Sequence, residues 1–410
     1  MRFRRLFKIA GVAFAVVAAW ALYEAFATPP PGPMGEVINP EEEVLTSQIL
    51  ANGVSIVNST QTGGIYHRDG HPKTQGCARA TFTVRPLSWP YSQGVFAQPR
   101  SYKAWVRFSS GNPEIQSDWK PDARGMAVKV LGVGGQKLLE GEENARTQDF
   151  LMMSNPAFFI ANVQEYAKLT RLQALGYQSN NGMTQFRYFL EDDAGRLWNP
   201  SGWRLREFRL ALGILKWPPK NLLATQYYSI TASTLGVQNY VKYSARPVAC
   251  DARSGIPGSG VWSFFDSDVL RHSLARQLAS ARKYCFDFMI QPQVQQKNMP
   301  VEDATVAWAE SDSPFIPAAR IELSAEDIGQ WEQSGFCENL SFSPWHALPE
   351  HRPVGGLNRI RKAVYQGISQ YRHCKNGVAM GEPKEDGSPA FETARCSANQ
   401  PVPGSARSPS

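Results

Sequence analysis

Hydrophobic and polar residues alternate in several short runs through the middle of the chain, and these runs are rich in β-branched and aromatic residues. Alternation with a period of two is typical of strands with one buried face. Residues 235–239 (LGVQN) separate two such runs and predict a hairpin turn. The predicted strands span residues 80–85, 103–109, 126–131, 227–234, 240–244 and 284–291.

A second pattern, with apolar residues three or four positions apart, predicts helices over residues 163–175, 269–282 and 355–372. The strands greatly outnumber these helices and do not alternate with them one by one. This order favours an α+β fold with antiparallel strands, which could close into a barrel. The chain contains no internal repeat.

Composition divides the chain into a globular body and two different ends. With 410 residues, 42% of them hydrophobic, the chain is long enough for a substantial core. We predict a signal peptide or membrane anchor over residues 1–27, a Pro-rich linker over 28–40, a folded domain over 41–375 and an unstructured tail over 376–410.

The first 27 residues combine four positive charges in MRFRRLFK with an apolar run from Ile9 to Tyr23. Residues 25–27 (AFA) fit the small-x-small pattern of a signal-peptide cleavage site, and large residues just before them favour an uncleaved anchor. Under either interpretation the positive-inside rule places the body outside the cytoplasm, in the periplasm if the cell has one.

The net charge of +7 does not indicate a nucleic-acid partner, because the leader supplies four of these charges and no basic stripe follows. The chain has six cysteines, and none of them forms a CxxC pair. In an oxidising compartment one disulfide is expected, but the sequence does not indicate which cysteines pair. Cys285 lies in an apolar run, which favours a buried thiol.

The last predicted helix contains an unusual stripe of Arg361, Tyr365 and Arg372. At about 100° per residue, these three side chains lie within about 40° of one another on one face. The ordinary interpretation is a tyrosine that stacks on an arginine at the surface. The alternative is a phenolate stabilised by a fixed positive charge, and tyrosine is a known axial ligand of haem iron.

Five motifs, taken in order, resemble those of the haem catalase family, and more closely its short, catalase-related peroxidase branch. The resemblance covers about residues 60–372, and it implies an antiparallel eight-stranded barrel with flanking helices. The motifs are RDGHPKTQG (68–76), WVRFSSGNP (105–113), PDARGMAVKV (121–130), NPAFFI (155–160) and Arg361-x-x-x-Tyr365.

On the distal side of haem b, the resemblance implies that His71 exchanges protons with peroxide and that Ser109 holds the histidine by a hydrogen bond. True catalases also carry a distal asparagine, five residues before the Phe-Phe pair. Met153 occupies that position here, and Asn155 lies two residues later. The substitution puts true catalase activity in doubt.

On the proximal side, the resemblance implies that Tyr365 is the iron ligand, with Arg361 beside it. The haem propionates would pair with Arg68, Arg107 and Arg372. Guanidinium groups suit this role because they bind carboxylates in a bidentate manner. Haem also needs an apolar wall, which Phe158 would help to form.

The sequence therefore predicts a haem-dependent peroxidase that reduces hydrogen peroxide or organic hydroperoxides, with an unspecified electron donor. Three alternatives stay open: a true catalase, a non-catalytic haem-binding module and a fatty-acid hydroperoxide isomerase. The resemblance does not extend to the long terminal arms that interlock the family's tetramers, so we do not expect a tetramer to be required.

Other histidines have weaker claims. His67 is a rival to His71 but lacks the lysine at +2 and the glycine at +5 that follow His71. A zinc site of His67, His71 and Cys77 would have unusual spacing and no fourth ligand. The remaining candidates lie in polar surroundings and are expected to be solvated: His346, His351 and His373.

Overall fold

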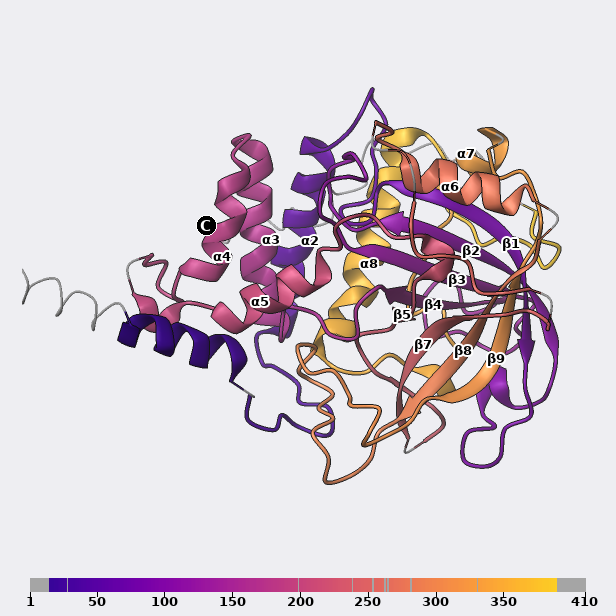
Figure 1. Cartoon of the computed structure of the whole chain (residues 1–410), viewed down its shortest axis with the longest axis horizontal. Helices are drawn as coiled ribbons and strands as arrows, with labels where there is room; N and C mark the ends of the chain where they lie inside the picture. Colours follow the sequence, from indigo (N-terminus) through magenta and orange to yellow (C-terminus); the bar gives the residue numbers. More distant parts are fainter. Residues whose placement is uncertain are drawn as a thin grey trace, which may run out of the picture.

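The protein is described by a computed structural model, which covers residues 15–388 except 28, 198, 238, 253, 262, 264, 281 and 330. Its centre is a closed antiparallel β-barrel, with helices gathered outside it (Figure 1). The strands are β1 (Thr74–Val84), β2 (Ser101–Ser110), β3 (Arg124–Leu131), β4 (Thr147–Met153), β5 (Tyr227–Tyr228), β6 (Ser233–Thr234), β7 (Tyr240–Val248), β8 (Tyr284–Pro292) and β9 (Ile316–Leu323).

Eight strands complete the ring in the order β5-β4-β3-β2-β1-β9-β8-β7, and β5 closes it by pairing with β7. The ninth strand, β6, follows β5 along the same edge of β7, so these two short strands act as one interrupted strand. The predicted antiparallel eight-stranded barrel with flanking helices is therefore confirmed.

Aromatic side chains fill the inside of the barrel. The ring of Phe288 lies 5.3 Å from Phe82 and 4.7 Å from Phe150, and all three are buried. Full burial of a side chain of this size is worth roughly 1.5–3 kcal/mol. Successive residues of a strand face opposite sides, so the outer face of β1–β4 is free to carry polar residues.

The helices are α2 (Glu42–Ser59), α3 (Val163–Gln178), α4 (Arg187–Leu190), α5 (Leu205–Ile214), α6 (Val269–Leu278), α7 (Trp331–Asn339) and α8 (Gly356–Asn376). Helices α2, α3 and α8 pack together beside the barrel (Figure 1). Gly367 allows α2 and α8 to approach closely, because a Cβ there would lie 2.8 Å from Leu50 Cδ1. Short 3₁₀ turns occupy Gly94–Phe96, Gly182–Phe186, Pro200–Gly202, Leu222–Ala224 and Pro349–His351.

The predicted strands and helices all overlap observed elements, with two larger differences. The predicted strand 227–234 is interrupted where Ile230 adopts a positive φ of 60°, and the predicted helix 269–282 ends at Leu278. Strands β4 and β9 were not predicted. Buried polar residues obscure the alternation in β4, and a proline follows the first residue of β9.

The two ends of the chain are only partly described. Residues 15–26 form a helix, and Arg209 Nε donates a hydrogen bond to Ala25 O at 2.7 Å. Residues 1–14 of the predicted leader lie outside the described residues. Within the described part of the chain, no helix combines the length and the apolar character needed to cross a bilayer.

The linker and the start of the tail both pack against the body. Glu36 in the linker pairs with Arg352 and Arg359, and Glu382 in the tail pairs with buried Lys129. The packed tail residues differ from the expectation of an unstructured segment. Residues 389–410 lie outside the described residues.

Two disulfides are described, Cys77–Cys337 and Cys250–Cys285, and Cys374 is also disulfide-bonded. The expectation of a buried Cys285 thiol was wrong. Pairing between β7 and β8 places Val248 opposite Cys285, which brings Cys250 just beyond the end of β7 within reach.

Candidate haem site

The site lies on the outer face of the barrel, where β2, β3 and β4 run side by side. Cross-strand pairing puts Ser109, Gly125 and Met153 in one row across these strands. Residues that pair directly point to the same face of a sheet. A Cβ at Gly125 would lie 2.7 Å from the His71 ring, so glycine is needed for the imidazole to lie against the row.

His71 is fixed by its backbone as well as by its ring. Its φ of 58° is in the left-handed region, which is uncommon outside glycine, and its amide donates to Gly111 O at 3.3 Å. Its Nδ1 lies 3.0 Å from Ser109 Oγ. Both residues of the predicted distal pair therefore meet.

His71 is held neutral by its surroundings. Burial lowers the pKa of His71 to about 3, and the positive charges of Arg107, Arg361 and Arg68 contribute in that order. A neutral imidazole has one nitrogen that can accept a proton and one that can donate it. The ring can therefore act as a proton carrier at neutral pH.

Arg107 links the histidine to the rest of the site. Its Nη2 donates to His71 O at 2.7 Å and to Thr74 Oγ1 at 2.7 Å, and its Nε also donates to Thr74 Oγ1. These bonds stabilise the uncommon backbone conformation of His71.

Three buried or largely buried arginines gather around a single carboxylate, that of Glu338 at the end of α7. Arg68 Nη1 lies 3.0 Å from Glu338 Oε2, and Arg372 Nη1 donates to Glu338 O at 2.8 Å. Arg68 Nη2 and Arg372 Nη2 both donate to Leu340 O. Three guanidinium groups and one carboxylate leave a surplus of two positive charges.

Burial and the surplus of positive charge together lower the pKa of two of the arginines. Burial lowers the pKa of Arg372 to about 9, and the charge of Arg68 adds to the effect while Glu338 opposes it. The pKa of Arg107 also falls well below its ordinary value, because of burial and then Arg68. Buried charges need partners, so this group is suited to bind an anion.

Helix α8 carries the predicted proximal stripe. The Arg361 guanidinium lies 4.8 Å from the centre of the Tyr365 ring, and its Nη1 donates to Asn358 Oδ1 at 3.0 Å. Arg361 Nε is buried and makes no hydrogen bond with the described residues. Within the same part of the chain, the Tyr365 hydroxyl is also without a hydrogen-bond partner, so it is available to a ligand.

Two other predicted residues lie in the loop after β4. Asn155 Nδ2 donates to Ala157 O at 2.7 Å, and Lys216 Nζ lies 3.5 Å from Asn155 Oδ1. Both ends of this amide are therefore used within its own neighbourhood. Phe158 is half-buried and packs at 4.7 Å from Phe159, in the apolar cluster of α3 and α4.

The sequence did not identify Glu338 or Asp69 as site residues. Burial raises the pKa of Asp69 to about 6. The pKa of Tyr166 is also raised, mainly by burial and then by the nearby Asp69 carboxylate. Asp69 stands directly between Arg68 and the His71 turn, so its proximity was visible in the sequence. Glu338 lies far along the chain, and no local pattern marked it.

The weaker histidine candidates have other partners. His67 Nδ1 lies 3.3 Å from Glu338 Oε1, and Cys77 is in a disulfide, which excludes the zinc site considered above. The expectation of solvated histidines was wrong, because buried pairing overrides the polar sequence around them. All three are 2% exposed: His346, His351 and His373.

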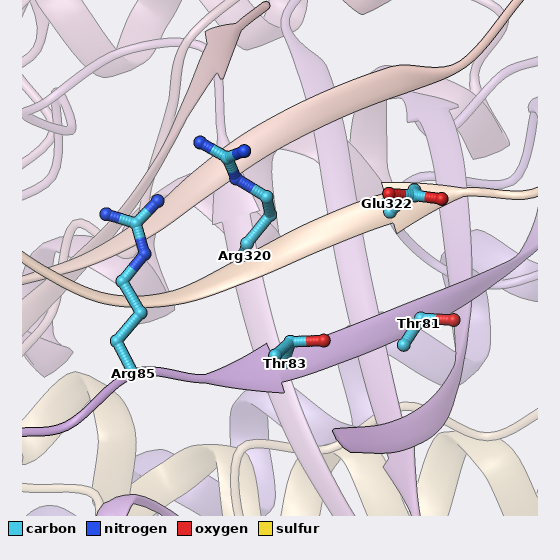
Figure 2. A pocket seen from close by; sticks show the side chains of 5 residues that line it. All are labelled: Thr81, Thr83, Arg85, Arg320 and Glu322. Carbon is cyan, nitrogen blue, oxygen red and sulfur yellow. The ribbon is translucent and has the colours of Figure 1, made fainter. Parts of the chain in front are cut away.

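Two further features are separate from His71. Glu142, His346 and Glu382 place their ligand atoms within 4.8 Å of one another, but Lys129 occupies the same group. An open hollow on the barrel surface is lined by residues of β1 and β9 (Figure 2). It lies seven or more residues along β1 from Thr74, or roughly 20–30 Å. Its lining residues are Thr81, Thr83, Arg85, Arg320 and Glu322.

The donor set fits haem b. The surplus of two positive charges equals the charge of two propionates, and Arg68, Arg107 and Arg372 would hold them. The Tyr365 hydroxyl would supply an oxygen ligand for iron, next to Arg361, whose buried Nε makes no hydrogen bond with the described residues.

Comparison with known proteins gives matches among solved structures only; no family model and no curated sequence matches. A fungal catalase has a TM-score of 0.55 at 17% identity, over 85% of this chain and 66% of that one. Catalase A from Saccharomyces cerevisiae has a TM-score of 0.54 at 17% identity, over 85% and 67%. A bacterial catalase has a TM-score of 0.51 at 14% identity, over 85% and 63%.

The chain thus spans about two thirds of the length of these catalases. At a sequence identity of 14–17%, the similarity to these structures concerns the fold alone. The chain has a catalase-like fold, an antiparallel eight-stranded barrel with helices beside it.

Proposed function

We propose that the protein binds haem b between the Ser109–Gly125–Met153 row and α8, and that it reduces hydrogen peroxide or an organic hydroperoxide. The observation that carries this proposal is the position of His71. Its ring is neutral, fixed by Ser109 and seated against Gly125, beside an arginine group with surplus positive charge.

Bound haem would supply the redox chemistry, with Tyr365 as the iron ligand and Arg68, Arg107 and Arg372 on the propionates. The protein's own part is proton transfer. In the tautomer that donates Nδ1–H to Ser109 Oγ, His71 Nε2 is left as an acceptor. It would take the proton from one peroxide oxygen and return it to the other, so that the second oxygen leaves as water or alcohol.

Two residues favour a peroxidase over a true catalase. Met153 lies in the same cross-strand row as Gly125, so its thioether shares the face of the sheet with His71. The Asn155 amide is engaged with Ala157 O and Lys216. Neither of these two described residues therefore offers a free amide to orient a second peroxide molecule, so donor oxidation should dominate.

The test is to load the purified full chain with haem and to add peroxide with and without a reducing donor. We expect donor oxidation to outpace oxygen release. Oxygen release as the main reaction would favour a true catalase. If the haem-loaded protein carries out neither reaction, the interpretation that remains is a non-catalytic haem-binding module.

We also propose that the body functions outside the cytoplasm. The described disulfides support this proposal, since such bonds persist in oxidising compartments. A reporter that requires export should be active when fused after residue 40. Activity of only a cytoplasmic reporter at that position would contradict the proposal.

A further inference from the structure

Glu338 stands inside the arginine group that would hold the propionates. Its Oε2 lies 3.0 Å from Arg68 Nη1 and 3.4 Å from Thr74 Oγ1, and its Oε1 lies 3.3 Å from His67 Nδ1. We propose that Glu338 is a specificity-determining residue, which sets the charge of this site so that it selects a macrocycle with two carboxylates. The inference rests on the proposed haem function and deepens it.

The charge count explains the selection. Without Glu338, the guanidinium groups of Arg68, Arg107 and Arg372 carry three positive charges. With it, two remain, which two propionates neutralise. A ligand with one carboxylate would leave a buried charge unpaired, and one with four would bury excess negative charge; both are costly.

Glu338 is ionised where it stands. Burial alone would raise the pKa of Glu338, but the charge of Arg68, the hydrogen bond with His67 and the charges of Arg372 and Arg107 hold it well below its ordinary value. The carboxylate therefore subtracts a full charge from the site at neutral pH.

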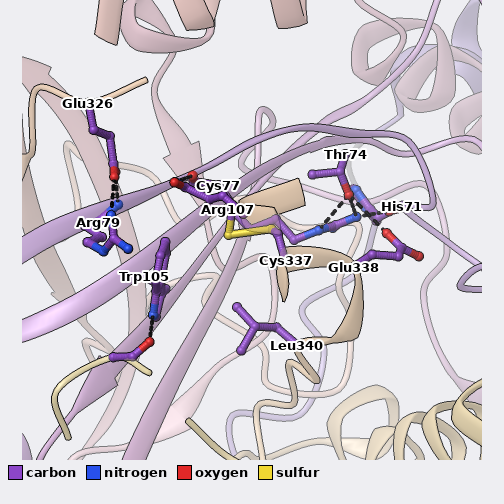
Figure 3. The surroundings of a disulfide bond; sticks show 12 residues. His71, Thr74, Cys77, Arg79, Trp105, Arg107, Glu326, Cys337, Glu338 and Leu340 are labelled. Carbon is purple, nitrogen blue, oxygen red and sulfur yellow. Dashed lines mark hydrogen bonds and ion pairs between the residues drawn. A yellow bond between two sulfur atoms is a disulfide. The ribbon is translucent and has the colours of Figure 1, made fainter. Parts of the chain in front are cut away.

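The fold holds Glu338 in place through its neighbour in the sequence. Cys337 forms a disulfide with Cys77 on β1 (Figure 3). Gln333 Nε2 also donates to Cys77 O at 2.7 Å. The Trp105 and Phe336 rings pack 4.9 Å apart beside the disulfide. Helix α7 is thus tied to the barrel one residue before the carboxylate.

Glu338 is also linked to His71 by a chain of hydrogen bonds. Thr74 Oγ1 donates to Glu338 Oε2 and accepts from Arg107, whose Nη2 donates to His71 O (Figure 3). The residue that sets the charge is therefore connected to the backbone that positions His71.

A purely structural ion pair would behave differently. Arg68 and Arg372 already donate to the carbonyls at the end of α7, so their positions do not depend on the Glu338 side chain alone. Loss of a purely structural ion pair would weaken the binding of all ligands to the same extent. Loss of a charge-setting residue would change the order of preference among ligands.

The experiment titrates the ligand-free full chain with two iron porphyrins, one with two carboxylates and one with four. We expect the wild type to bind the dicarboxylate more tightly. In Glu338→Gln, the affinity ratio should shift by about tenfold or more towards the tetracarboxylate, whereas Glu338→Asp should keep the wild-type order. Glu326→Gln is the matched control. Glu326 pairs with Arg79 on β1, the strand that also carries Cys77, but this ion pair lies outside the site (Figure 3).

Cys337→Ser provides a second route that keeps the carboxylate but releases α7, and it should shift the ratio in the same direction. If both porphyrins weaken equally in Glu338→Gln and Cys337→Ser, the inference is overturned while the haem proposal stands. If Glu338→Gln does not fold, the ratio in Cys337→Ser decides. If the folded wild type binds neither porphyrin, the inference and the proposed function fall together.

Discussion

Two buried ionic groups lie on the outer face of the same barrel, and they differ in how their charges are balanced. The first group surrounds Lys129 on β3, which contacts Asp149, His346 and Glu382, while His346 Nε2 contacts Glu142 at 2.9 Å. Three carboxylates there face one lysine and one histidine. The pKa of His346 rises to about 10, because the charges of Glu382 and Asp149 outweigh burial and the repulsion of Lys129.

The second group surrounds Glu338 and has the opposite character. Three arginines share one carboxylate, and burial together with mutual repulsion lowers the pKa of Arg107 and Arg372. The Lys129 group satisfies its cations internally, whereas the Glu338 group leaves two of them unmatched. This difference supports the proposal that the Glu338 group, and not the Lys129 group, binds an anionic ligand.

The largest expected effect is on Tyr365, which belongs to the ligand side of the comparison. Tyr365→Phe removes the phenolic oxygen and should lower haem affinity by at least about 100-fold, the loss that even a residue behind a metal ligand can cause. The measurement is haem loading together with the ligand-to-iron absorption bands. Tyr371→Phe on the same helix is the control, since Tyr371 bonds Asn58. Unchanged loading and spectrum in Tyr365→Phe would exclude Tyr365 as the ligand.

The next effect concerns the neutral histidine beside the unmatched group. His71→Ala should slow the reaction with peroxide by about 10²- to 10⁴-fold, the usual contribution of general acid–base catalysis, while haem stays bound. Stopped-flow kinetics would measure the rate. His67→Ala is the matched comparison, because His67 contacts Glu338 and lacks the Ser109 contact. A wild-type rate in His71→Ala would make the histidine structural.

The Lys129 group, whose cations are all paired, should affect the pH dependence of stability. Because the pKa of His346 is raised from 6.5 to about 10, its stabilisation is complete below pH 6.5 and is lost as pH rises through 10. The loss should stay below the upper bound of about 5 kcal/mol that this shift allows. Urea unfolding at pH 6.5 to 10 would measure it. An equally steep pH dependence in His346→Gln would assign the effect to other groups.

The smallest effect is expected at Met153, which pairs with Gly125 in the same cross-strand row and contributes no charge. Met153→Asn should raise oxygen release relative to donor oxidation by a few-fold, roughly the 0.5–1.5 kcal/mol of one added hydrogen bond. Asn155→Ala should leave the ratio unchanged, since its amide bonds Ala157. A changed ratio in Asn155→Ala alone would identify Asn155 as the distal amide.

Much of the barrel followed from local patterns, because β1, β2, β3, β7 and β8 each have one apolar face that fills the core. The strand β4 escaped prediction because Lys129 on the neighbouring strand pairs with its Asp149 in a buried ionic group. Burial of such charges depends on long-range partners, which a local pattern does not contain.

The candidate site was predictable in part for a similar reason. His71, Arg107 and Ser109 lie in local motifs, and strand pairing brings them together. Glu338 reaches them only through the closure of the chain between Cys77 and Cys337, which are 260 residues apart. The sequence therefore pointed to the arginines of the site but not to the carboxylate among them.

The most direct test of the account is a titration of the ligand-free full chain with haemin and with its dimethyl ester, followed by absorption. The unmatched charges of the Glu338 group predict saturation at one haemin per chain, and at least about tenfold weaker binding of the ester, which lacks both carboxylates. Equal affinity for the two compounds, or no saturable binding of haemin, would contradict the claim that these charges await a dicarboxylate ligand.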